Sequence, residues 1–123
     1  MRAQSPVRLD FHTEVQPDVA VVKRRDDDYE SRHPTPADVL LLVEVSDATL
    51  RYALEAKAPL YARHGIPELW IVDLQADLLH FRSAPVAGRY SAAFSRADAG
   101  LTEIGSLPGA RIDLSALFRA ERN

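Results

Sequence analysis

The chain of 123 residues contains no cysteine, so its sequence offers neither a disulfide framework nor a thiolate metal site. It has no apolar run long enough to span a membrane. Residues 1–10 also lack the apolar segment of a signal peptide. Together these absences are typical of a cytoplasmic protein and predict no contact with a membrane.

An excess of positive charge is absent as well, because the formal net charge is -3. Proteins that bind nucleic acid through their overall electrostatic field are usually basic. Contact with nucleic acid must therefore come from a local patch or from metal ions that neutralise phosphates. The only tight basic cluster is Lys23, Arg24 and Arg25, at the start of a charged stretch over residues 23–38. This stretch predicts an exposed, mobile loop, with contact to a DNA backbone as the alternative for the cluster.

The length fits a single domain over residues 1–123 that can bury a core without staples. Apolar or alternating segments predict strands. These segments are residues 7–11, 19–22, 39–45, 69–73 and 78–82, with a weaker strand pair at 90–94 and 101–104 and a loop at 83–89.

A helix is predicted over residues 50–64, because Gly65 supplies the left-handed position that commonly ends a helix. Pro59 lies inside this helix and should kink it near Glu55. The order of elements is β-β-β-α-β-β, followed by weaker strands. This order predicts an α/β (α+β) fold, a mixed sheet with the main helix packed on one face.

Glu44 is a carboxylate inside the otherwise apolar segment 39–45. Burying it without a partner would be costly. It must meet a metal or a lysine, or else reach solvent at the open end of the sheet, and the pattern favours neither alternative. Asp18 lies between Pro17 and the next apolar segment, a position that on its own is more typical of a structural turn.

Lys57 shares a helical stripe with Leu50, Leu54 and Tyr61, and this stripe must face the sheet. A lysine there either extends to the edge of the helix or meets a buried acid. Glu44 favours the second alternative, because an acid on the strand and a lysine on the following helix can satisfy each other.

Asp18, Glu44 and Lys57 together predict one catalytic site. The carboxylates of Asp18 and Glu44, on neighbouring strands, can hold Mg²⁺ with waters completing its shell. The metal would activate a bound water and clamp a phosphate, and the Lys57 ammonium would orient that water or offset developing charge. These components are sufficient in kind to hydrolyse a phosphodiester bond.

The motifs also carry a resemblance to a known family. They are Pro17-Asp18, the stretch 43–46, Lys57, the stretch 61–63 and the stretch 65–73. In order, spacing and context they closely resemble the Uma-two family of putative restriction endonucleases, within the PD-(D/E)xK nuclease superfamily. The resemblance covers about residues 7–118, nearly the whole chain.

The resemblance implies a restriction-endonuclease-like core and a bacterial endonuclease that uses Mg²⁺ or Mn²⁺ and acts on DNA. Asp18 and Glu44 match the family's two acids, which would hold the metal. The lysine usually found two residues after the second acid is Ser46 here. In this family the lysine is thought to come from the following helix, which fits Lys57.

Two departures from the family pattern support other hypotheses. Ala53 stands where members usually carry an acid, and the usual N-terminal helix and strands are expected to be missing. One alternative is a catalytically silent nuclease-fold domain used for binding or assembly, in which an uncovered apolar surface would favour a homodimer. Another is an unrelated α/β binding domain in which Glu44 and Lys57 form only a buried salt bridge.

The remaining polar candidates have structural interpretations. Asp73 is predicted to cap a turn after its strand. Trp70 is predicted to lie in the core or to line the groove near the site. The histidines show no metal-ligand spacing and are predicted to be surface or structural residues: His12, His33, His64 and His80.

Overall fold

The computed structural model describes residues 2–3, 7–8, 14–15, 17–23, 34–97 and 100–114. Its centre is a six-stranded sheet with the order β1-β4-β5-β6-β7-β8. The strands are β1 (Arg2–Ala3), β4 (Val19–Val22), β5 (Val39–Ser46), β6 (Glu68–Asp73), β7 (Leu78–Val86) and β8 (Arg89–Arg96). Only the β5–β6 pair is parallel, because the helix crosses over between these two strands.

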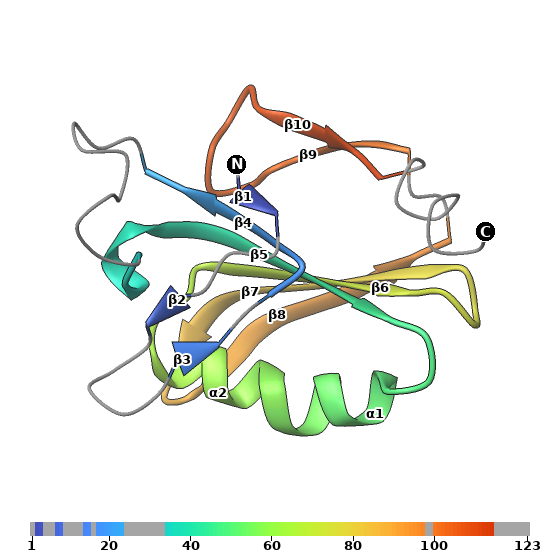
Figure 1. Cartoon of the computed structure of the whole chain (residues 1–123), viewed down its shortest axis with the longest axis horizontal. Helices are drawn as coiled ribbons and strands as arrows, with labels where there is room; N and C mark the ends of the chain where they lie inside the picture. Colours follow the sequence, from blue (N-terminus) through green and yellow to red (C-terminus); the bar gives the residue numbers. More distant parts are fainter. Residues whose placement is uncertain are drawn as a thin grey trace.

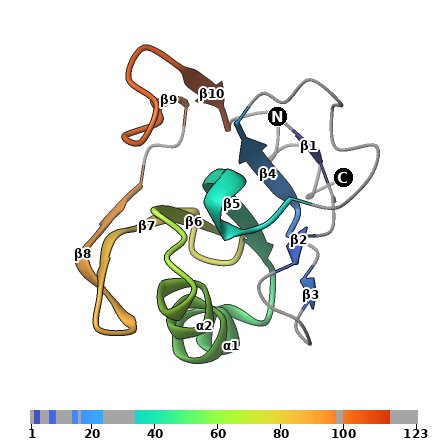
Figure 2. The same cartoon turned by 90° about the vertical axis from the view of Figure 1, so that its left-hand side faces the viewer.

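One helical segment packs on one face of this sheet (Figure 1). Two smaller strand pairs flank it: β2 (Val7–Arg8) with β3 (Glu14–Val15), and β9 (Leu101–Glu103) with β10 (Arg111–Asp113). Figure 2 shows the layers end-on, with the helix on one side of the sheet and β9–β10 on the other. The predicted α+β fold with a mixed sheet and one main helix is confirmed. No helix in the described part of the chain is long and apolar enough to cross a membrane.

Strands β5 and β6 are buried on both faces, which explains why their sequences are nearly continuous apolar runs. On the helix side, Leu42, Leu69 and Ile71 form one hydrophobic cluster with residues of the helix. On the far side, Leu41 and Trp70 form a second cluster with residues that follow β8. Adjacent residues of one strand therefore stabilise two different layers.

The helix is continuous but irregular. It consists of α1 (Leu50–Tyr52), a π-helical stretch η2 (Ala53–Lys57) and α2 (Ala58–Arg63). The Ala58 amide donates to the Ala53 carbonyl, which closes a wider π-type turn. Pro59 follows at once and has no amide hydrogen to donate. The predicted distortion near Glu55 is therefore present, as a π turn.

The helix ends as predicted at Gly65, whose φ of 76° is left-handed. The Ile66 amide donates to the Tyr61 carbonyl and the Gly65 amide to the Ala62 carbonyl, both at 3.1 Å. These two bonds form a Schellman motif. They fix the chain direction into β6.

The prediction of a loop over residues 83–89 was wrong. β7 continues to Val86, and β8 begins at Arg89 after a tight turn in which Ala87 and Gly88 both have positive φ. Ala84 also has positive φ, and the register between β7 and β8 is the same on both sides of it, with Pro85 paired to Tyr90.

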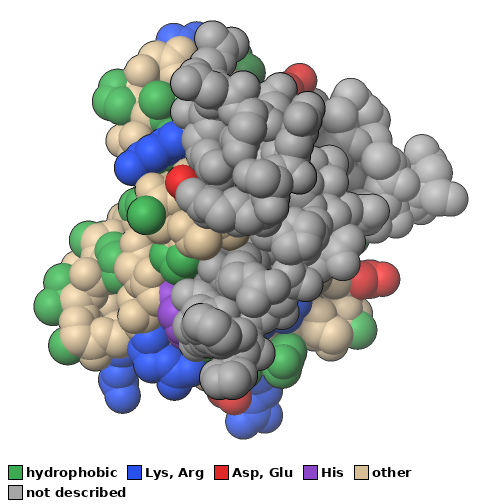
Figure 3. All heavy atoms as spheres, turned by 60° about the vertical axis from the view of Figure 1, so that its left-hand side comes forward, with side chains coloured by type: hydrophobic (Ala, Val, Ile, Leu, Met, Phe, Trp, Pro, Cys, Tyr) green, Lys and Arg blue, Asp and Glu red, His purple; other side chains and the backbone are tan. Residues whose placement is uncertain are grey.

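The predicted pairing of residues 90–94 with 101–104 was also wrong. Strand β8 pairs with β7, while β9 pairs with β10. Hydrophobic side chains are exposed on the lobes that these strands form (Figure 3).

The predicted loop at residues 23–38 is only partly described. Lys23 is exposed, but Pro34 is buried and a 3-10 helix, η1 (Pro36–Asp38), leads into β5. The 34–38 part is therefore ordered, contrary to the prediction. Residues 24–33, with Arg24, Arg25 and His33, lie outside the described residues, as does most of the predicted 7–11 strand.

Candidate active site

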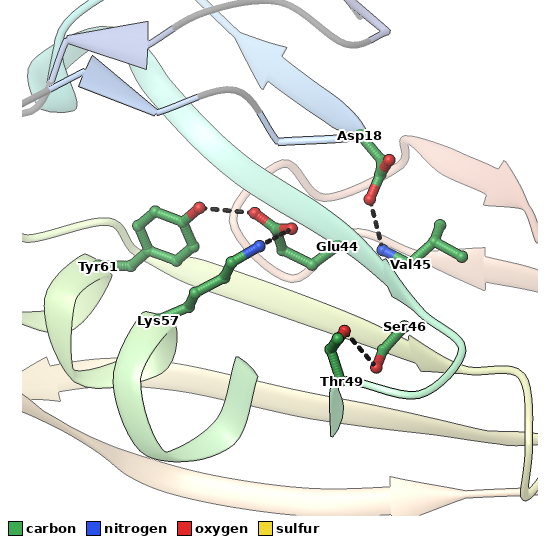
Figure 4. Close-up of polar contacts among 7 residues, drawn as sticks. All are labelled: Asp18, Glu44, Val45, Ser46, Thr49, Lys57 and Tyr61. Atoms are coloured by element: carbon green, nitrogen blue, oxygen red, sulfur yellow. Dashed lines mark hydrogen bonds and ion pairs between the residues drawn. The ribbon is translucent and has the colours of Figure 1, made fainter. Parts of the chain in front are cut away.

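The candidate site lies between β5 and the helix, around the carboxylate of Glu44. This side chain faces the helix and the residue is only 5% exposed. The Lys57 ammonium donates to Oε2 of Glu44 at 3.0 Å, and the Tyr61 hydroxyl donates to Oε1 at 2.6 Å (Figure 4). Both oxygens of a buried carboxylate thus have donors, as its burial requires.

Lys57 and Tyr61 reach Glu44 together because they are four residues apart and lie on one face of the helix. The Lys57 side chain is 37% exposed, whereas that of Glu44 is 7% exposed. The ion pair therefore runs from the buried strand to a partly open edge. The predicted contact between Glu44 and Lys57 is present.

Asp18 lies just before β4, beside the part of β5 that carries Glu44. Val19, the next residue, pairs with Val43 in the antiparallel β4–β5 ladder. Its Oδ2 accepts the Val45 amide at 2.6 Å (Figure 4). Asp18 and Glu44 thus lie near each other in the sheet, but their carboxylates have different partners in the structure.

Tyr61 is the residue whose role the sequence did not reveal. Burial raises the pKa of its hydroxyl strongly, and the charge of Glu44 and the hydrogen bond to it add to the effect. Tyr61 therefore remains a neutral donor to Glu44 at ordinary pH. The sequence signal that could have revealed this role is the position of Tyr61, four residues after Lys57 on the stripe of the helix that faces the sheet.

Ser46, where the resemblance implies that a lysine is usual, is buried and has no ammonium group to supply. Its hydroxyl lies 3.3 Å from that of Thr49, just before the helix (Figure 4). The ammonium group beside Glu44 belongs to Lys57 on the helix.

A metal ion would have two carboxylates to bind. Within residues 17–23, 34–97 and 100–114, no three His, Asp or Glu side chains stand close enough together to hold a metal ion. The neighbouring Asp18 and Glu44 offer hard oxygen ligands, which suit a cation such as Mg²⁺ that keeps several of its waters. The chemistry of these two oxygen donors suits such an ion, whereas in the structure both Glu44 oxygens accept hydrogen bonds from Lys57 and Tyr61.

The structural predictions for Asp73 and Trp70 are confirmed. Asp73 Oδ1 accepts the amides of Gln75 and Ala76 at 3.1 and 3.3 Å, which caps the turn after β6. Trp70 is fully buried, and its Nε1 donates to Glu68 Oε2 at 2.8 Å.

The two described histidines have protein partners rather than a shared metal position. Nδ1 of His80 is 2.7 Å from the Ser95 hydroxyl, and Nδ1 of His64 is 2.9 Å from the Leu60 carbonyl. His12 lies outside the described residues, like His33.

The mixed sheet, the two carboxylates near each other in it and the lysine on the crossing helix fit the class of proteins with a restriction-endonuclease-like α+β core. Comparison with protein families agrees with this class. A family model described as "Uma2: Putative restriction endonuclease" matches residues 1–115, so the chain belongs to this family. No curated protein matches the chain.

Proposed function

We propose that this protein is an endonuclease that hydrolyses DNA phosphodiester bonds with Mg²⁺ or Mn²⁺ as cofactor. The observation that carries the proposal is the buried carboxylate of Glu44, 3.0 Å from the Lys57 ammonium, with Asp18 bound to the amide of the next residue, Val45. Membership in a family described as "Putative restriction endonuclease" supports DNA as the substrate.

The chain's own residues would perform distinct tasks. Asp18 and Glu44 would hold the metal, which when bound lowers the pKa of a water and clamps the phosphate. Tyr61 holds Glu44 in a fixed orientation. Lys57 is partly exposed and can donate to the attacking water or to a phosphate oxygen, where charge develops as the bond to the leaving oxygen breaks.

A second candidate function is a catalytically silent nuclease-fold domain that binds or oligomerises. It is favoured by the fact that both Glu44 oxygens already accept hydrogen bonds from Lys57 and Tyr61. The resemblance to the family also implies an acid at position 53, where this chain has the buried Ala53. Metal binding separates the two functions, because a bound cation at 100 times its Kd would stabilise the fold by about 2.7 kcal/mol.

Plasmid and single-stranded DNA cleavage with Mg²⁺ or Mn²⁺ tests the proposal. We expect Asp18→Ala, Glu44→Gln and Lys57→Ala each to lower the rate about 100-fold or more, in the range seen when a preorganised charge-stabilising group is removed. Matched controls lie on the same helix. Glu55→Ala and Arg51→Ala remove an acid and a cation that pair at 3.1 Å on the exposed side and should cut normally.

Two outcomes would contradict the proposed nuclease activity. One is a folded parent protein that cuts no DNA and gains no stability from either metal, which would favour the silent domain. The other is retention of full cleavage by Glu44→Gln, which would place the activity elsewhere or in a contaminant.

A further inference from the structure

A second cavity lies on the face of the sheet away from Glu44. It has a volume of about 520 Å³, within the range of small-molecule sites. It opens between the β7–β8 hairpin and the β9 strand with the loop that follows. The residues that define its chemistry are Phe81, Phe94, Arg96, Thr102, Glu103 and Ser106.

One wall of this cavity is an aromatic stack. The rings of Phe81 and Phe94 are nearly parallel, with centroids 4.4 Å apart and an interplanar angle of 10°. Trp70 meets the Phe81 ring edge-on at 5.6 Å from the core side. Phe94 is nevertheless 58% exposed. The core thus fixes the first ring and leaves much of the second uncovered, which makes Phe94 a firm stacking surface.

The polar groups of the cavity carry both signs of charge. The Arg96 guanidinium lies 5.3 Å from the centre of the Phe81 ring and donates to the Thr102 hydroxyl at 2.7 Å. The Glu68 carboxylate accepts hydrogen bonds from the Trp70 indole and from the Ser106 amide and hydroxyl, so its position in the cavity wall is fixed. Because Glu68 and Glu103 line the same cavity as the arginine, the cavity is a poor site for a phosphate, which is negative on every side. A neutral aromatic ring with donors and acceptors on its edge suits these groups better.

The cavity and the candidate active site lie on opposite faces of the same sheet, so a strand that reached both would have to pass round the edge of the sheet. β5 pairs with β6, β6 with β7 and β7 with β8, so β8 lies three strand spacings from β5. At about 4.8 Å per spacing this is roughly 14 Å across the sheet. In Figure 3, hydrophobic side chains are exposed on the upper and the lower lobe of the molecule, with a recess between the two lobes.

We propose that this cavity binds an unpaired nucleobase of single-stranded nucleic acid, which stacks on Phe94 and meets Arg96 and the neighbouring hydroxyls with its edge. Stacking of bases on aromatic side chains is tolerant of sequence and needs a strand whose bases are free. The proposal does not depend on hydrolysis, since the site uses no residue of the Glu44 cluster.

The test is the anisotropy of a labelled single-stranded oligonucleotide titrated with the full chain in EDTA, where hydrolysis with a metal cannot occur. Loss of one aromatic platform weakens binding by about 5- to 150-fold. We expect Phe94→Leu, which keeps an apolar side chain, to fall in this range, and Phe94→Trp to bind at least as well as the parent. Competition with unlabelled duplex and with free mononucleotides distinguishes a base within a strand from a free nucleotide.

Controls come from the same hairpin. Val86→Ala removes another exposed apolar side chain, 63% exposed and outside the cavity, and should change binding less than about twofold. Arg89→Ala removes a cation of the same strand that does not line the cavity. Arg96→Ala removes one that does, and it should weaken oligonucleotide binding several-fold more than Arg89→Ala.

Equal binding by the parent and a folded Phe94→Leu protein would overturn the proposal, as would a parent that binds no oligonucleotide or prefers duplex. A parent that dimerises in sedimentation experiments, with dimerisation lost in Phe94→Leu and no change in oligonucleotide binding, would assign the face to a second copy of the chain. If the protein cleaves no DNA with either metal but still binds the oligonucleotide in EDTA, the base-binding cavity is supported and the proposed nuclease activity is contradicted.

Discussion

At the scale of single residues, Tyr61 offers the sharpest prediction. Its hydroxyl is one of two donors that satisfy the buried Glu44 carboxylate. Tyr61→Phe keeps the ring and leaves one carboxylate oxygen without its donor. We expect a loss of about 1–3 kcal/mol in the free energy of unfolding, measured with urea, and a weaker metal-dependent gain of stability because Glu44 is no longer held.

Tyr90→Phe is the matched control for this prediction. The Tyr90 hydroxyl is near enough to act on the charge of Tyr61, but it donates to a different acceptor, the Ile66 carbonyl at 2.9 Å. Its loss should also lower stability but should leave the metal response and DNA cleavage unchanged. Equal effects of both substitutions on the metal response would show that Tyr61 acts only through general stability.

The sequence alone predicted part of this site. Glu44 and Lys57 stood out because each is a charged residue in an apolar pattern, and burial demanded that they meet. The bond from Val45 to Asp18 depends on the exact register of β4 and β5, which no local pattern specifies. Tyr61 was hidden because a tyrosine on a buried stripe is ordinary core, and only its partner reveals the polar role of its hydroxyl.

At the scale of elements, the end of the helix can be tested at Gly65. Its φ of 76° is strained for any residue with a side chain, although a Cβ there would meet no atom within 4 Å. Gly65→Ala should therefore cost about 1–2 kcal/mol of unfolding free energy through backbone conformation alone. Gly65→Asn should cost less, because asparagine tolerates the left-handed region better. Urea unfolding of the three proteins measures the order, and an alanine variant as stable as the parent would contradict the argument.

The elements that the sequence predicted are those with a long local signal. Strands β5 and β6 are apolar on both faces, and the helix carries both a period and a stop at Gly65. The partner of β8 was predicted wrongly because its residues are largely exposed and carry little hydrophobic pattern. That pairing is set by the turn at Ala87 and Gly88, where an alanine with positive φ gives no sequence signal.

At the scale of the whole molecule, the central sheet separates two hydrophobic layers, and the helix-side layer holds two unusual hydroxyl groups. Tyr61 belongs to that layer, and Tyr90 packs against it from β8. Burial is the main cause that raises the pKa of each hydroxyl far above the ordinary value of 10.0. The folded molecule therefore keeps two protons that the unfolded chain releases in alkali.

This difference predicts a loss of stability in alkaline solution. Because the folded pKa values are raised, the stabilisation is complete below about pH 10 and declines as the pH rises further. Each tyrosine adds a slope of about 1.4 kcal/mol per pH unit above that point. Urea unfolding at several values between about pH 9 and pH 11 measures the slope, with tyrosinate absorbance to follow ionisation. Tyr61→Phe and Tyr90→Phe should each remove about half of it, whatever their effect at neutral pH. A slope that persists in the double variant would mean that other groups govern alkaline unfolding and that these hydroxyls ionise freely in the folded state.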